Sequence, residues 1–153
     1  MRIAVLHGPN LNLLGTREPE KYGTQTLDDI ERDLKRVGKE LGVRLTFAQH
    51  NSEGDLIEAI HALRGKADGA IINAGAFTHT SLALRDAFLS VSVPFAEVHL
   101  TNIYAREPER RTSMLAPAAV GVVCGFGAQS YELGLRGLVA RLNEQPKASG
   151  LRA

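Results

Sequence analysis

The chain has 153 residues, 44% of them apolar and 23% charged, and its formal net charge at neutral pH is +1. A chain of this length forms one domain of ordinary size, which buries roughly 70% of the surface that its unfolded form exposes. This composition excludes an intrinsically disordered chain and a protein that coats nucleic acid. The apolar runs are too short to span a membrane and no cleavable signal pattern follows Met1, so we expect a cytoplasmic protein that binds neither membrane nor nucleic acid.

Strand-like and helix-like apolar patterns alternate along the chain, which is typical of a parallel sheet covered by helices on both faces. In chain order the predicted elements are a strand at 3–6, a helix from Thr26 to Gly42, a strand at 43–48, a helix from Ser52 to Gly65, a strand at 69–72, a helix at 81–90, strands at 95–98 and 119–124, and a helix at 128–143. Together they make a single domain over residues 1–144. The stretch 145–153 lacks apolar periodicity, and we expect a disordered tail there.

Particular residues sharpen these predictions. Thr26 can cap its helix through a side-chain oxygen, and the alternating apolar residues of 43–48 indicate a strand that is covered on one face. Gly134 and Gly137 weaken the last helix by roughly 1 kcal/mol each relative to alanine, so packing within the chain or against another subunit must compensate. The one cysteine, Cys124, lies in an apolar run; it excludes an internal disulfide and a cysteine metal cluster, and we expect a buried, unreactive thiol.

Two connections are longer than a compact fold requires. Residues 6–25 separate the first strand from its helix and residues 100–117 precede the fifth strand, whereas ordinary connections of this kind have about 2–6 residues. In parallel α/β sheets the ligand binds beyond the carboxyl ends of the strands, where both connections emerge. They are therefore the candidates for function.

The first connection carries Tyr22 and Arg17, five residues apart, in a polar segment bracketed by Gly15 and Gly23 that can close as a lid. A phenol with an ordinary pKa is only about 0.1% ionised at pH 7, so a tyrosine acts as a base only where cations favour the phenolate. Arg17 is the local cation for that purpose. On these residues alone, a catalytic tyrosine and an ordinary exposed one both remain open.

Polar groups also follow the third and fourth strands. Asn73 and His79 accompany a run of hydroxyls that suits a polyhydroxylated ligand, although Ser81 can simply cap the next helix. Glu97 and His99 lie on the same side of the fourth strand, where the carboxylate can orient the imidazole and favour the charged form that a general acid needs. Three arginines follow and suit an anionic substrate. A structural ion-pair cluster and an ordinary loop histidine remain the alternatives.

Four separated motifs occur in order along the chain: Gly8-Pro9-Asn10-Leu11-Asn12-Leu13-Leu14-Gly15 with Arg17-Glu18-Pro19 and Tyr22-Gly23, Asn73-Ala74-Gly75, Thr78-His79-Thr80-Ser81, and Glu97-Val98-His99. From about residue 2 to residue 143 the sequence resembles the type II 3-dehydroquinate dehydratases. The resemblance implies a flavodoxin-like three-layer α/β/α sandwich with a five-stranded parallel sheet, and a homododecamer of four trimers. It implies no metal or cofactor, and the reversible conversion of 3-dehydroquinate to 3-dehydroshikimate, in aromatic amino acid biosynthesis or quinate catabolism.

The same resemblance implies roles for individual residues. Tyr22 would remove the proton at C2, with Arg17 supporting the phenolate; Asn10 would hold a water at the enolate, and His99, oriented by Glu97, would protonate the departing C1 hydroxyl. The other expected substrate-binding groups are Asn73, the backbone amides of Leu100 and Thr101, His79, Arg110, and Asp86 from a neighbouring subunit.

Two positions depart from the family pattern. Thr101 stands where the family usually has serine, which keeps the hydroxyl and adds a methyl group. Glu109 stands beside Arg110 and can compete for its guanidinium, in a stretch that the family commonly fills with basic residues and histidines. These changes bear on substrate affinity and not on the type of reaction.

Other functional classes fit less well. A phosphoacceptor domain would need acidic residues after the first strand and an aspartate in place of Asn73, and a flavin carrier would need a hydroxyl-rich loop where Pro9 and Leu11 stand. A Schiff-base dehydratase needs a buried lysine, whereas the five lysines lie in polar segments: Lys21, Lys35, Lys39, Lys66 and Lys147. An assembly protein without catalytic activity remains open.

Overall fold

The computed structural model describes residues 1–16 and 18–144, and of residues 21 and 22 it describes the main chain. Five parallel strands form one sheet in the order β2-β1-β3-β4-β5. Their bounds are β1 Arg2–His7, β2 Arg44–Gln49, β3 Gly69–Asn73, β4 Phe95–His99 and β5 Gly121–Cys124. This strand order is that of the flavodoxin-like fold, so the predicted fold class is confirmed.

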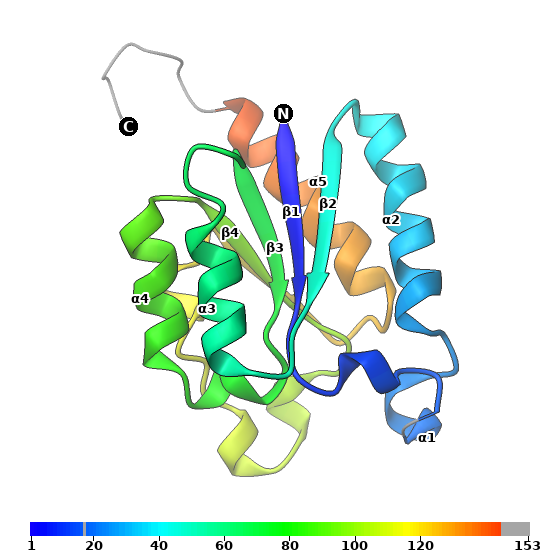
Figure 1. Cartoon of the computed structure of the whole chain (residues 1–153). Helices are drawn as coiled ribbons and strands as arrows, with labels where there is room; N and C mark the ends of the chain where they lie inside the picture. The colour runs from blue at the N-terminus through cyan, green and yellow to red at the C-terminus, as the bar shows by residue number, and fades with distance from the viewer. Residues whose placement is uncertain (17, 145–153) are drawn as a thin grey trace.

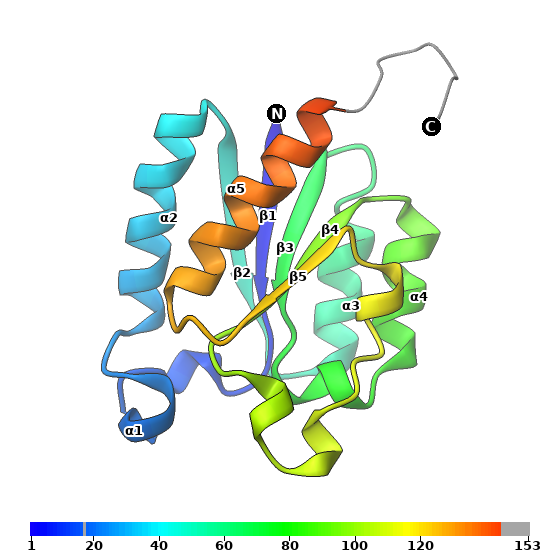
Figure 2. The same cartoon turned by 180° about the vertical axis from the view of Figure 1, so that it is seen from behind.

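Helices cover both faces of the sheet (Figures 1 and 2). On one face lie α2 (Leu27–Leu41) and α5 (Gln129–Glu144), and on the other lie α3 (Glu53–His61) and α4 (Leu82–Val91). Each pair closes its own apolar core against the sheet, one around Leu34 and Leu135 and the other around Leu56 and Phe88. The central strands β3 and β4 are buried along their whole length, as a sheet covered on both sides requires.

The predicted helix caps are present. The Thr26 hydroxyl accepts a hydrogen bond from the Asp29 amide, and the Asp29 carboxylate accepts one from the Thr26 amide, so the two residues form a reciprocal capping box. Gly42 ends α2 in the left-handed conformation at φ 68°. Ser52 and Ser81 cap α3 and α4 in the same manner as Thr26, each accepting a backbone N–H from three residues later.

Three details of the sequence prediction were wrong. Helix α3 ends at His61 and not at Gly65, because the chain continues in tight turns closed by hydrogen bonds over three residues. Strand β5 begins at Gly121 and not at residue 119, since residues 119 and 120 form a bend that follows the short 3₁₀ helix η5 (Ala116–Ala118). Cys124 is only partly buried, because β5 is an edge strand with a single neighbour. The expected disordered tail, 145–153, lies outside the described residues.

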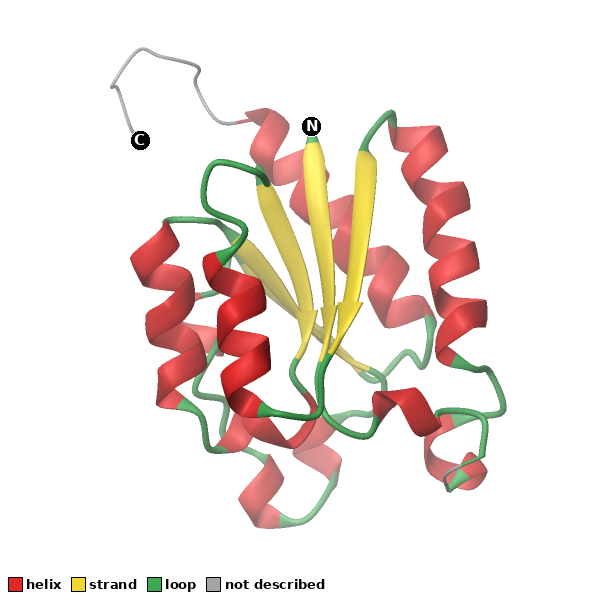
Figure 3. Ribbon diagram, viewed as in Figure 1, coloured by secondary structure: helices red, strands yellow, loops and turns green. Residues whose placement is uncertain are grey.

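The first long connection and the first half of the second fold into short helices beyond the carboxyl ends of the strands, at the arrowheads in Figure 3. The first connection contains η1 (Leu11–Leu13) and α1 (Pro19–Tyr22), and the second contains η3 (Ile103–Ala105) and η4 (Pro108–Arg110) at this edge. The second connection then returns past α4 to η5, which leads into the start of β5 (Figure 2). A fifth 3₁₀ segment, η2 (Gly75–His79), follows β3 at the carboxyl edge. Among the described residues, no helix combines the length and the apolar character needed to cross a bilayer.

Candidate active site

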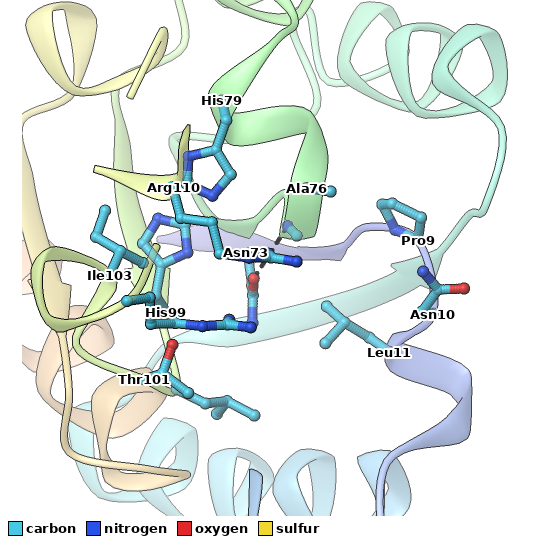
Figure 4. A pocket seen from close by; sticks show the side chains of 13 residues that line it. Pro9, Asn10, Leu11, Asn73, Ala76, His79, His99, Thr101, Ile103 and Arg110 are labelled. Carbon is cyan, nitrogen blue, oxygen red and sulfur yellow. Dashed lines mark hydrogen bonds between the residues drawn. The ribbon is translucent and has the colours of Figure 1, made fainter. Parts of the chain in front are cut away.

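A polar pocket lies at this carboxyl edge, between the first connection and the ends of β3 and β4 (Figure 4). Its lining comprises Pro9, Asn10, Leu11, Asn73, Gly75, Ala76, His79, His99, Leu100, Thr101, Ile103, Arg106 and Arg110. In Figure 4 the residues of the first connection stand on one side, the two histidines and Arg110 stand on the other, and Asn73 lies between them. Residues more than 60 positions apart in the sequence therefore face one small space.

Most of the predicted site residues come together here. Seven line the pocket: Asn10, Asn73, His79, His99, Leu100, Thr101 and Arg110. Asp86 is exposed on α4 and is not part of this lining. Arg17 lies outside the described residues, and for Tyr22 the description extends only to the main chain of α1.

The end of the first connection borders the same site. A groove beside the pocket is lined by Gly23, Thr24 and Gln25, and it shares Leu100 and Thr101 with the pocket. Gly23 directly follows Tyr22 in the sequence. The main chain next to the candidate base thus adjoins residues that line the pocket of the candidate acid.

The candidate acid is held by a buried carboxylate, as the strand alternation predicted. Nε2 of His99 lies 2.5 Å from Oε2 of Glu97, and Glu97 itself is completely buried. The hydroxyl of Ser113 donates to the other carboxylate oxygen at 2.7 Å, and Ser113 in turn accepts the amides of Leu115 and Ala116. Both oxygens of Glu97 are therefore engaged, which fixes the plane of the carboxylate and with it the imidazole.

Sequence reasoning missed Ser113, because nothing in its local pattern distinguishes it from other loop hydroxyls. The long second connection leaves β4 and then returns to it, and this path brings Ser113 to Glu97.

The second histidine is fixed by the same connection. Nδ1 of His79 lies 2.9 Å from the carbonyl oxygen of Thr112, and because a carbonyl only accepts, Nδ1 carries a hydrogen. The rings of His79 and His99 are nearly parallel, with centroids 6.4 Å apart. In the neutral form of His79, Nε2 is then an acceptor, so the pocket offers a ring nitrogen suited to a ligand hydroxyl.

Backbone geometry positions two asparagines of the pocket lining, Asn73 and Asn10. Oδ1 of Asn73 accepts the amide of Gly75 at 3.2 Å, at the point where β3 turns into η2. Asn10 has φ 70°, in the left-handed region that asparagine tolerates better than most residues. Its backbone N–H donates to Oδ1 of Asn51 at 2.9 Å. Such uncommon backbone conformations cluster at ligand sites.

Arginines supply the positive charge. The side chains of Arg106 and Arg110 reach the pocket, and both approach Oε1 of Glu107, at 3.4 Å and 3.2 Å. The pKa of the Glu107 carboxyl lies below its usual value, because its own backbone amide and then the two guanidinium groups stabilise the charged form.

The expected competitor for Arg110 was Glu109, and this prediction was wrong. The carboxylate that meets Arg110 belongs to Glu107, because the 3₁₀ helix η4 brings residues three positions apart onto one side. Arg106 was noted in the sequence only as part of a basic stretch, and its place in the lining comes from the fold. Among the described residues, no three His, Cys, Asp or Glu side chains are arranged to hold a metal ion.

The parallel sheet has the order 2-1-3-4-5, and His99, Arg106 and Arg110 line a pocket beyond the carboxyl ends of its strands. These features define a flavodoxin-like α/β protein with a site suited to a small anionic molecule. Comparisons with known proteins make the assignment specific. Residues 1–139 match the model of the family described as Dehydroquinase class II, and the chain belongs to this family.

Individual relatives agree with this assignment. The chain is 62% identical to the 3-dehydroquinate dehydratase of Gemmatimonas aurantiaca, over 98% of this chain and 100% of that protein. Among solved structures, the type II dehydroquinase of Propionibacterium acnes superimposes with a TM-score of 0.86 at 39% identity, covering 91% of this chain and 96% of the other. The type II dehydroquinase of Butyrivibrio crossotus gives 0.87 at 36% identity, covering 94% and 98%.

Proposed function

We propose that the chain is a 3-dehydroquinate dehydratase, a hydro-lyase that converts 3-dehydroquinate reversibly to 3-dehydroshikimate in the shikimate pathway or in quinate catabolism. The observation that carries this proposal is the meeting of two segments at one site. His99, held by Glu97, lines the pocket, and the residue that follows Tyr22 borders the groove that shares Leu100 and Thr101 with it. An acid at the end of β4 and a base in the first connection can then act on one small ring.

The reaction is an anti elimination in two steps. Tyr22, as phenolate supported by Arg17, takes the proton from C2, which the neighbouring ketone makes acidic, and the electron pair of that bond forms an enolate. Asn10 holds a water that stabilises the enolate oxygen. The enolate then re-forms the ketone while the C1–O bond breaks, and the imidazolium of His99 gives its proton to the departing hydroxyl, which leaves as water. Since Glu97 binds Nε2 of His99, the other ring nitrogen is the one that serves the substrate.

Binding is assigned to the remaining pocket residues. Asn73 and the backbone amides of Leu100 and Thr101 hold the substrate carboxylate, and His79 and Arg110 bind ring hydroxyls. All five line the pocket. The lining thus supplies the acid and the binding groups, and the first connection adds Tyr22 and Arg17.

Asp86 acts in a neighbouring subunit of a homododecamer composed of four trimers, in a cytoplasmic enzyme. Its exposed position on α4, away from the pocket of its own chain, suits this role. Complementation between subunits tests it. Tyr22→Phe and Asp86→Ala proteins, each weakly active alone, should regain activity when their subunits are mixed and reassembled, because some sites then receive both native residues. Mixed oligomers that stay at the level of the parent variants would refute the shared site.

A dehydratase that works through a Schiff base is the chemical alternative. The described lysine side chains, Lys35, Lys39 and Lys66, are all exposed, which does not suit a lysine whose amine must be neutral to attack a ketone. Borohydride added together with 3-dehydroquinate should therefore leave the enzyme active. Covalent trapping of substrate on a lysine would favour the alternative mechanism.

The decisive assay follows the conjugated enone of the product by its ultraviolet absorbance. Purified protein should produce this absorbance from 3-dehydroquinate; protein that leaves the substrate unchanged would be an assembly protein without this activity. Tyr22→Phe should lower turnover about 100- to 10,000-fold, the usual contribution of a general base, with substrate binding largely retained. Tyr104→Phe is the matched control, because Tyr104 is 55% exposed and does not line the pocket. Equal turnover in the two variants would show that the base is another residue.

A further inference from the structure

A serine hydroxyl outside the pocket completes the hydrogen bonds of the carboxylate that holds the candidate acid. Ser113 lies in the second connection and does not line the pocket. Its hydroxyl lies 2.7 Å from Oε1 of Glu97, and Oε2 of the same carboxylate lies 2.5 Å from Nε2 of His99. The proposed mechanism uses Glu97 and His99, and it gives Ser113 no part in the transfer of the proton.

The direction of the bond between Ser113 and Glu97 follows from the other partners of the serine. A hydroxyl has one hydrogen to donate and two lone pairs that accept. The backbone amides of Leu115 and Ala116 can only donate, and they lie 3.1 Å and 2.9 Å from the serine oxygen. These amides occupy both lone pairs, so the hydrogen of Ser113 is directed at Oε1 of Glu97.

This direction decides where the proton of the buried pair lies. Because Oε1 of Glu97 accepts from Ser113, a hydrogen on the carboxyl group would have a partner only at Oε2, where it would face Nε2 of His99. A hydrogen bond donated to a carboxylate stabilises the charged form, and the distance of 2.7 Å is in the range of such bonds, about 2.5–2.7 Å. The hydrogen between the two side chains therefore belongs to Nε2 of His99, and the negative charge belongs to Glu97.

The segment that carries Ser113 is attached on both sides of this residue. The carbonyl of Thr112 accepts the hydrogen on Nδ1 of His79 at 2.9 Å, so two consecutive residues serve the two histidines of the pocket. The amide of Met114 donates to a carbonyl of η2 at 2.8 Å, and the side chain of Leu115 is completely buried in one of the two cores. These contacts give the oxygen of Ser113 a fixed place beside Glu97.

We propose that Ser113 is a positioning residue for the proton transfer, and that it acts on His99 through Glu97. Its hydroxyl keeps the carboxylate in one orientation and in the charged form, and the carboxylate keeps a hydrogen on Nε2 of His99. The ring then presents Nδ1 to the substrate, and the hydrogen on that nitrogen passes to the departing hydroxyl. This inference deepens the proposed function and rests on the role of His99 as the acid in it.

Ser113→Ala is the direct test, because it removes the hydroxyl and changes no residue of the pocket lining. Its kcat should fall about 10- to 100-fold, the range for the loss of a hydrogen bond to a charged group, while KM stays near the wild-type value. Ser113→Thr keeps a hydroxyl and should retain most of the turnover. A kcat of Ser113→Ala equal to that of the wild type would overturn the proposal, as would a loss that appears only in KM.

Ser130→Ala is the matched control for the loss of a structural hydroxyl. Ser130 is completely buried, and its hydroxyl oxygen accepts the amide of Phe126 at 3.1 Å, as the oxygen of Ser113 accepts two amides. Ser130→Ala should lower thermal stability and leave kcat unchanged. If kcat fell in proportion to thermal stability in both alanine variants, the hydroxyl of Ser113 would serve only the fold, and the proposal would be wrong.

A double variant tests whether Ser113 acts through Glu97. Glu97→Gln removes the negative charge that the serine supports, so the addition of Ser113→Ala should cost little further turnover. Losses of kcat that multiply in the double variant would mean that the two residues act independently, which contradicts the proposal.

Structures without substrate keep this inference separate from the dehydratase assignment. In crystals of Ser113→Ala, the Glu97 carboxylate and the His99 ring should leave their wild-type positions, and in Ser113→Thr they should keep them. Unchanged positions in Ser113→Ala would refute the positioning role, whatever the enzyme does to 3-dehydroquinate. Conversely, the expected displacement in a protein that leaves 3-dehydroquinate unchanged would refute the proposed function and support the role of Ser113 at Glu97 and His99.

Discussion

The close contact between α5 and β4 allows a quantitative test of whether packing holds Glu97 and His99 in position. A Cβ atom added at Gly134 would lie 2.5 Å from Cγ1 of Val98, whereas ordinary carbon contacts are about 3.5–4.0 Å. Val98 stands between Glu97 and His99 on β4. Gly134→Ala gains about 1 kcal/mol of helix propensity, but the forced displacement of Val98 or α5 costs about 1–3 kcal/mol. The net change should be between none and about 2 kcal/mol of destabilisation.

Gly137→Ala, one turn later on the same helix, is the matched control. A Cβ atom at this position meets nothing within 4 Å, so alanine should stabilise the protein by about 0.5–1 kcal/mol. The propensity gain is common to both variants, and the difference between them therefore isolates the cost of overpacking, about 1–3 kcal/mol.

Urea unfolding followed by circular dichroism measures both stabilities, and the dehydratase assay measures whether the displacement reaches His99. Turnover should fall in Gly134→Ala and not in Gly137→Ala. If the two alanine variants were equally stable and equally active, the packing of α5 against β4 would not require glycine at position 134, and the prediction would be refuted.

Three further predictions concern the site and its surroundings. Glu97→Gln should lower kcat more than it raises KM, because the imidazole loses the carboxylate that orients it, and steady-state kinetics will distinguish this from a loss of binding. Gly8→Ala should destabilise the protein strongly, since the new methyl group would collide with the backbone oxygen of Ala74, and thermal melting checks this. Hydrogen bonds with Thr26 are the main cause of the lowered pKa of Asp29. The charged carboxylate therefore contributes stability at pH values above the pKa of a free aspartate, about 3.9, and this contribution is lost as the pH falls through the lower pKa of Asp29 in the folded protein. Asp29→Asn should therefore be less stable than the wild type at pH 7 and equal to it near pH 2, as urea unfolding at each pH will show.

Local chemistry made much of this fold predictable. Thr26, Ser52 and Ser81 cap their helices as expected, because an N-cap is decided by one side chain and the backbone two or three residues later. The pairing of Glu97 with His99 was equally accessible, since alternation along a strand fixes which residues share a face.

Features that depend on distant parts of the chain were not predictable in this way. The contact of Ser113 with Glu97 requires the path of a long connection, and the choice of Glu107 over Glu109 as the partner of Arg110 requires the local 3₁₀ geometry. His7 attracted no attention in the sequence, because its partners, Tyr131 and Glu31, lie on two separate helices. Long-range tertiary contacts, and not local propensity, assemble the surroundings of the catalytic groups.

The division of the site between buried strands and short surface helices has a consequence for how the enzyme fails. Amides of β3 and β4 lie in the interior of the sheet, and they exchange with solvent only when the whole domain opens. The 3₁₀ segments at the carboxyl edge are three to five residues long, and segments of this kind open at far smaller free energies. As the urea concentration rises, catalysis should cease while the circular dichroism of the sheet and its covering helices is still unchanged. The enzyme is therefore inactivated at a lower urea concentration than the one that unfolds the domain.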